Sequence, residues 1–203
     1  MANIASVDYE AIPGKTLEMK RIGQTLMKEI QGAYTDVENM HSVWYGKRYN
    51  ELLGDFNNLV PKVNELIDLV WGEIPYTLEI VANNYAKADG VSIRAAERAN
   101  PTKIIELSIP SDTGMRFESS SVLSVRDSVV GKFNNAKNEM DQFQTVYRGI
   151  NWESDASRVF EGRFVSLKSQ VVEAFNTISN SFQRLMTETE EDIQSTETNN
   201  TVN

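Results

Sequence analysis

The feature that most constrains this chain is a bend marked by tryptophan and flanked on both sides by helical apolar spacing. The first bend reads Trp44-Tyr45-Gly46, and the second reads Trp152-Glu153-Ser154, 108 residues further along a chain of 203 residues. Apolar residues recur every three or four positions before and after each bend, which is the spacing of an amphipathic helix. The sequence therefore predicts two copies of one helical hairpin.

The second helix of each copy carries the clearest repeat. A shift of 108 residues places apolar on apolar: Phe56 on Phe164, Leu59 on Leu167, Val63 on Val171 and Val70 on Ile178. Pro61 and Pro75 interrupt the first of these two helices. Since proline removes a backbone donor and its ring clashes with the preceding turn, we expect a kink at each, with the true break at Pro75.

The linker between the hairpins, residues 90–118, loses the helical periodicity. Gly90 is suited to end a helix, and Ile104 to Ile109 reads as extended chain, either a short strand or a strap on other apolar surface. A link between antiparallel hairpins must travel the length of the molecule, and a linker this long is able to do so. We therefore expect an all-α fold in which two hairpins pack antiparallel as a four-helix bundle, a pseudo-dimer with a long non-helical linker.

This interpretation divides the chain into five parts. They are an irregular N-terminus (1–16), a first hairpin (17–89), the linker (90–118), a second hairpin (119–197) and a disordered tail (198–203).

Composition removes several classes of function. The formal net charge of −9 disfavours nucleic acid as a partner. The chain has no cysteine and one histidine, His41, so thiolate and multi-histidine metal sites are not expected. No phosphate-binding glycine loop, metalloprotease motif or nucleophile elbow is present. We expect no enzymatic activity, no cofactor and no small-molecule substrate.

The sequence also bears on location. The first residues lack the basic and apolar regions of a secretory signal peptide, and no run of 18 apolar residues predicts a membrane span. An exported form of this chain would therefore use a route other than a cleavable signal peptide.

The motifs resemble the WXG, or ESAT-like, family of type VII secretion substrates. The family pattern is helix, Trp-Xaa-Gly at the bend, helix, and Tyr-Xaa-Xaa-Xaa-Asp at the end. The first copy has Trp44, Gly46, Tyr85 and Asp89, whereas the second has Ser154 in place of the glycine. The positions equivalent to Tyr85 and Asp89 in the second copy hold Ile193 and Glu197, which do not match the pattern.

The resemblance implies small hairpins that pair antiparallel and are exported folded by a type VII secretion ATPase. The export or recognition residues would be Trp44, Gly46, Tyr85, Asp89 and Trp152. In an antiparallel arrangement Tyr85 and Asp89 would lie close to Trp152, so that one end of the molecule carries a complete signal. The plainer alternative is that both tryptophans simply fill their bends.

The resulting hypothesis is a secreted or cell-envelope protein, cytoplasmic before export, that acts by protein–protein interaction with a secreted partner or with itself. Two alternatives stay open. One is a cytoplasmic adaptor or chaperone that presents an export signal for a larger secreted protein. The other is a purely structural helical assembly protein.

Overall fold

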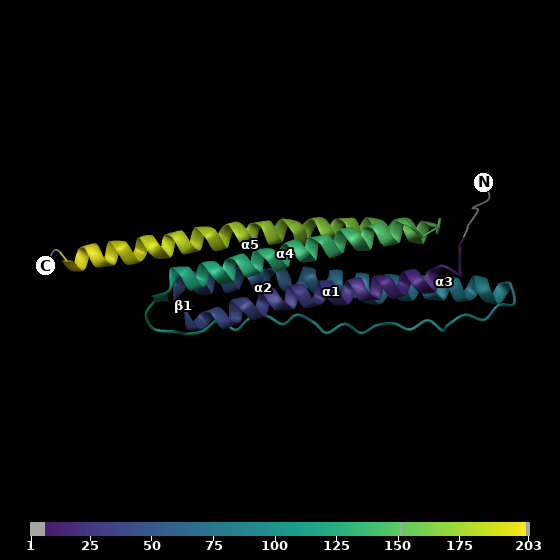
Figure 1. Ribbon diagram of the computed structural model, residues 1–203, viewed down its shortest axis with the longest axis horizontal. Helices are drawn as coiled ribbons and strands as arrows, with labels where there is room; N and C mark the ends of the chain where they lie inside the picture. Colours follow the sequence, from purple (N-terminus) through teal and green to yellow (C-terminus); the bar gives the residue numbers. More distant parts are fainter. Residues whose placement is uncertain (1–6, 151, 202–203) are drawn as a thin grey trace.

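The chain is built almost entirely of helices, which pack lengthwise against one another (Figure 1). A computed structural model describes residues 7–150 and 152–201. The prediction of an all-α fold is confirmed. The helices are α1 (Ile12–Asn39), α2 (Lys47–Ile67), α3 (Ile74–Ala88), α4 (Ser119–Arg148) and α5 (Asp155–Thr201); two-residue strands β1 (Trp44–Tyr45) and β2 (Arg116–Phe117) and two short helical turns, η1 (Met40–Ser42) and η2 (Asp68–Glu73), complete the order.

The core lies between two main helix pairs, α1 with α4 and α2 with α5. Aromatic rings fill its middle layer, where Phe133 stacks on Phe175 with ring centroids 4.1 Å apart. Phe56 lies against Phe133 and meets Tyr34 edge to face at 5.1 Å. The apolar stripes seen in the sequence are thus the buried faces of the helices. No helix in the described ranges is both long and apolar enough to cross a membrane.

Two helix ends differ from the sequence expectation. Helix α1 begins at Ile12, inside the segment 1–16 that we expected to be irregular, because proline is tolerated in the first turn, where Pro13 lies. Helix α5 continues to Thr201, through the first part of the expected disordered tail 198–203. That part of the sequence contains no glycine or proline to stop the helix. Residues 1–6 and 202–203 lie outside the described residues.

The two prolines of the second stripe act differently. Pro61 lies inside α2, which continues past it to Ile67. Pro75 lies in the first turn of α3 and directly follows η2, a π-helical turn of six residues. Proline has no N–H for the ordinary bond to the fourth residue before it, so a local change of helical pattern at this point is physically reasonable.

The strap, residues 90–115, connects α3 to β2 and runs beside the helices back toward β1 (Figure 1). Before β2 it contains no regular helix or strand. Every third side chain faces the helices, with one slip of register near Pro101. A three-residue period is typical of polyproline-II-like extended chain. The inward residues are half-buried at Ile93, Ala96, Ala99 and Pro110 and fully buried at Ile104 and Leu107.

Three asparagines of α2, seven residues apart, hold the second half of the strap. Asn64 and Asn57 each accept a hydrogen bond from a strap N–H and donate one to the same residue's carbonyl, at Ile104 (2.8 and 2.9 Å) and Leu107 (2.7 and 2.9 Å). Asn50 donates to the carbonyl of Pro110 at 3.1 Å. Seven residues of α-helix rise about 10.5 Å, and three residues of polyproline-II chain rise about 9.3 Å. The two periods therefore nearly match.

Candidate functional site

Trp44, at the first bend, is a core residue. It is only 1% exposed and lies in an aromatic cluster with Tyr49, Phe117 and Phe182. Its ring stacks on Phe182 of α5 with centroids 5.9 Å apart. Strand β1 pairs antiparallel with β2, so that Trp44 lies opposite Phe117. A partner therefore cannot contact the Trp44 side chain unless the helices separate. The direct role of Trp44 is to pack the bend against α5.

Gly46 is required by backbone geometry. Its φ of 117° and ψ of −169° fall in a region that side-chain-bearing residues rarely enter. A Cβ at this position would also lie 3.2 Å from the carbonyl oxygen of Gly114 in the strap. The Trp-Xaa-Gly motif of this bend is thus explained by a buried ring and a turn that only glycine fits.

Tyr49 connects the bend to α1. Its hydroxyl donates to the carbonyl of Val37 at 3.0 Å. Burial, with smaller contributions from the charges of Glu38 and Asp112, raises the pKa of Tyr49 to about 12. The side chain is therefore a neutral, hydrogen-bonded part of the core at physiological pH.

The second bend has a different construction. Trp152 is 8% exposed and lies near one ring, that of Phe160, at 6.3 Å. Ser154, which replaces the glycine, accepts a hydrogen bond from the backbone N–H of Ser157 at 3.0 Å. This is the geometry of a helix N-cap. The serine therefore starts α5 where the first bend needs glycine for a turn.

Tyr85 and Asp89 lie at the end of α3 and are both exposed, Tyr85 to 37%. Gly90 ends the helix with φ of 74°, and Val91 N–H reaches back to the carbonyl of Ala86 at 2.8 Å. The nearby Asp89 carboxylate is the main cause of the raised pKa of the Tyr9 hydroxyl.

The expected proximity of Tyr85 and Asp89 to Trp152 is indirect. Within the described part of the chain, no aromatic contact or hydrogen bond joins Tyr85 to Trp152. Instead, both places touch the segment that leads into α1. Val7 forms an antiparallel backbone bridge with Trp152, and Tyr9, two residues later, has its pKa raised mainly by the nearby Asp89. This short segment therefore connects the end of α3 with the second bend.

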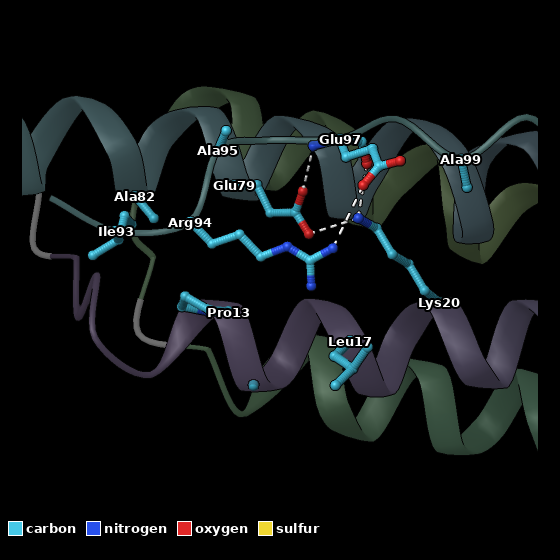
Figure 2. A pocket seen from close by; sticks show the side chains of 11 residues that line it. Pro13, Leu17, Lys20, Glu79, Ala82, Ile93, Arg94, Ala95, Glu97 and Ala99 are labelled. Carbon is cyan, nitrogen blue, oxygen red and sulfur yellow. Dashed lines mark hydrogen bonds and ion pairs between the residues drawn. The ribbon is translucent and has the colours of Figure 1, made fainter.

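A hollow of about 470 Å³ lies beneath the first half of the strap, between the start of α1 and α3 (Figure 2). Its walls are largely apolar: Pro13, Leu17, Ala82, Ile93, Ala95 and Ala99. Leu17, which is 63% exposed, forms the wall on the α1 side.

Charged groups close the polar side of the hollow. Lys20 pairs with Glu79 at 2.6 Å and donates to the carbonyl of Glu97 at 2.8 Å. The second oxygen of Glu79 accepts the N–H of Glu97 at 2.9 Å. Arg94 projects across the hollow, and its closest acidic partner is Glu97, with Nη2 and Oε2 3.5 Å apart (Figure 2).

Sequence reasoning missed the asparagine contacts and this hollow. The asparagines had a visible signal, since Asn50, Asn57 and Asn64 repeat every seven residues in a helix, where asparagine has low intrinsic propensity. The strap also had a visible sequence signal, because its apolar residues recur at every third position. The hollow had no such signal, because it depends on where the strap crosses two helices.

Comparisons with family models, curated proteins and solved structures found no match. In the described residues, no three histidine, cysteine or acidic side chains gather in a way that would hold a metal ion.

Proposed function

We propose that this chain is a fused pair of WXG-like hairpins, exported folded by a type VII secretion system and acting by protein–protein contact. The observation that carries the proposal is that one short segment, which leads into α1, lies against both the end of α3 and the second bend. The Asp89 carboxylate is close enough to the Tyr9 hydroxyl to raise its pKa, and Trp152 bridges to Val7. An exposed Tyr85 and Asp89 at the end of α3 and the second bend are then presented together, as a secretion ATPase would require.

The proposal includes antiparallel packing of the hairpins into a four-helix bundle. Side-chain pairs between helices support it. Glu29 contacts Asn135 while Asp36 contacts Lys132, so partner numbers fall along α4 as they rise along α1. Between the second helices the same trend appears: Arg48 with Glu188, Asp55 with Ser181, and Glu73 with Arg163.

Spin labels test this packing directly, because the natural chain has no cysteine. The doubly labelled variant Lys87→Cys/Glu153→Cys is expected to give a short distance. The variant Lys47→Cys/Glu153→Cys is expected to give a long one, since about 40 residues of helix between positions 47 and 87 span roughly 60 Å. Parallel hairpins would reverse the two results.

Export is tested in a bacterium with an active type VII system. Tyr85→Ala is expected to abolish appearance of the protein in the medium while leaving its thermal unfolding unchanged, because Tyr85 is exposed. Tyr76→Ala is the matched control, since Tyr76 is a partly exposed tyrosine on the same helix. Normal export of Tyr85→Ala, or export that persists without the ATPase, would contradict the proposal. Retention in the cell together with a larger secreted protein would instead indicate the adaptor.

A further inference from the structure

We propose that the hollow beneath the first half of the strap is a binding site for an aliphatic carboxylate, a small molecule with an apolar body and one anionic end. This inference does not depend on the proposed role in secretion. It rests on the size of the hollow, its walls, and the exposed guanidinium of Arg94 that extends across it.

The size and walls suit the apolar body. A volume of about 470 Å³ falls within the range of ligand pockets in proteins, which are mostly apolar with a few fixed polar groups. Ala82 and Ala99 keep the space open, because the side chain of each is only a methyl group. Leu17 supplies an apolar wall that the protein leaves exposed.

The polar groups favour an anion. Lys20 and Glu79 are engaged with each other and with both backbone groups of Glu97. Arg94 carries five N–H donors, and its contact with Glu97, at 3.5 Å, lies at the limit of a hydrogen bond. Both side chains of this pair are more than three-quarters exposed. The Glu97 carboxylate is therefore free to turn into solvent and leave the guanidinium to a ligand.

The strap makes the site possible. In its second half, two asparagines fix the backbone with paired hydrogen bonds and Ile104 and Leu107 are fully buried. In its first half the inward residues are only half-buried. The first half of the strap is therefore less firmly packed than the second, and the exposed Arg94 side chain extends from it across the hollow (Figure 2).

The test is a titration of the full chain with octanoate, followed by amide NMR. Shifts are expected at Ala82, Ile93 and Ala99, with octanoate binding at least tenfold more tightly than octylammonium. Arg94→Gln is expected to weaken octanoate binding about tenfold, because one charge-assisted hydrogen bond is lost. Arg98→Gln is the matched control, since Arg98 lies on the same strap but pairs with Asp68 outside the hollow.

A second variant tests the space rather than the charge. Ala99→Phe fills the hollow from an inward, half-buried strap position and is expected to abolish binding while the helical circular dichroism signal stays unchanged. The proposal is overturned if octanoate causes no shifts at these residues. It is also overturned if octylammonium binds as well as octanoate, or if Arg94→Gln binds as tightly as the Arg98→Gln control.

Discussion

The two bends of this molecule have similar sequences but different physical constructions. At the first, a fully buried Trp44 lies among three aromatic rings and Gly46 adopts a backbone conformation closed to other residues. At the second, Trp152 contacts one ring and Ser154 caps the following helix. Both bends therefore bury a tryptophan, whereas only the turn at the first bend requires a glycine.

Removal of the two tryptophan rings gives the largest expected contrast. Trp44→Ala is expected to lower the free energy of unfolding by about 3–5 kcal/mol, because it leaves a cavity in a closed aromatic cluster. Trp152→Ala is expected to cost no more than about half as much, since its ring has fewer neighbours. Urea unfolding of both variants measures the contrast, and equal losses would show that the second bend is as tightly built as the first.

The next contrast compares the glycines of the two bends. Gly46→Ala is expected to cost up to about 3 kcal/mol, because φ of 117° strains any side-chain-bearing residue and the new Cβ meets the Gly114 carbonyl. Gly149, at the end of α4, has φ of −77°, and a Cβ there meets its nearest atoms at 3.4 Å. Gly149→Ala is therefore expected to change stability by less than about 0.5 kcal/mol. A similar loss in both variants would remove the special status of Gly46.

The tyrosines beside the bends provide a pH test. Burial raises the pKa of Tyr49 to about 12, while an unfolded tyrosine titrates near 10. The folded state therefore holds its proton more tightly, so this contribution is complete below pH 10 and is lost as pH rises toward 12. At the second bend, burial also raises the pKa of Tyr147, but a hydrogen bond from Ser157 opposes the shift.

Unfolding measured between pH 8 and 12 checks this assignment. Tyr49→Phe is expected to lose about 2 kcal/mol less than the natural chain over that interval. Tyr147→Phe is expected to remove a smaller part of the pH dependence. If the Tyr49→Phe curve runs parallel to that of the natural chain, the hydroxyl of Tyr49 titrates normally and the first bend is more open than described.

The helices were predictable from sequence because their burial is periodic. Phe56, Phe133 and Phe175, for example, are all buried, and each belongs to an apolar stripe with helical spacing on its own helix. Helix α1 begins inside the segment predicted to be irregular, because Pro13 fits the first helical turn.

The site was less accessible to sequence reasoning. Tyr85 and Asp89 were assigned by resemblance, and the segment that connects Asp89 to Trp152 through Tyr9 had no pattern of its own. Arg94 looked like any surface arginine of a linker. Such contacts depend on tertiary placement, which a local sequence pattern does not encode.

The smallest contrast concerns Ser154, and it separates stability from recognition. Ser154→Ala is expected to cost about 1 kcal/mol, because the N-cap bond to Ser157 is lost. Ser154→Gly is expected to cost only a few tenths, since glycine is an acceptable cap residue, and it gives the second bend the complete Trp-Xaa-Gly pattern. If only the Tyr85 and Asp89 pair limits export, Ser154→Gly will be exported at the natural rate. A marked increase in export with unchanged unfolding would mean that a secretion partner reads this glycine directly.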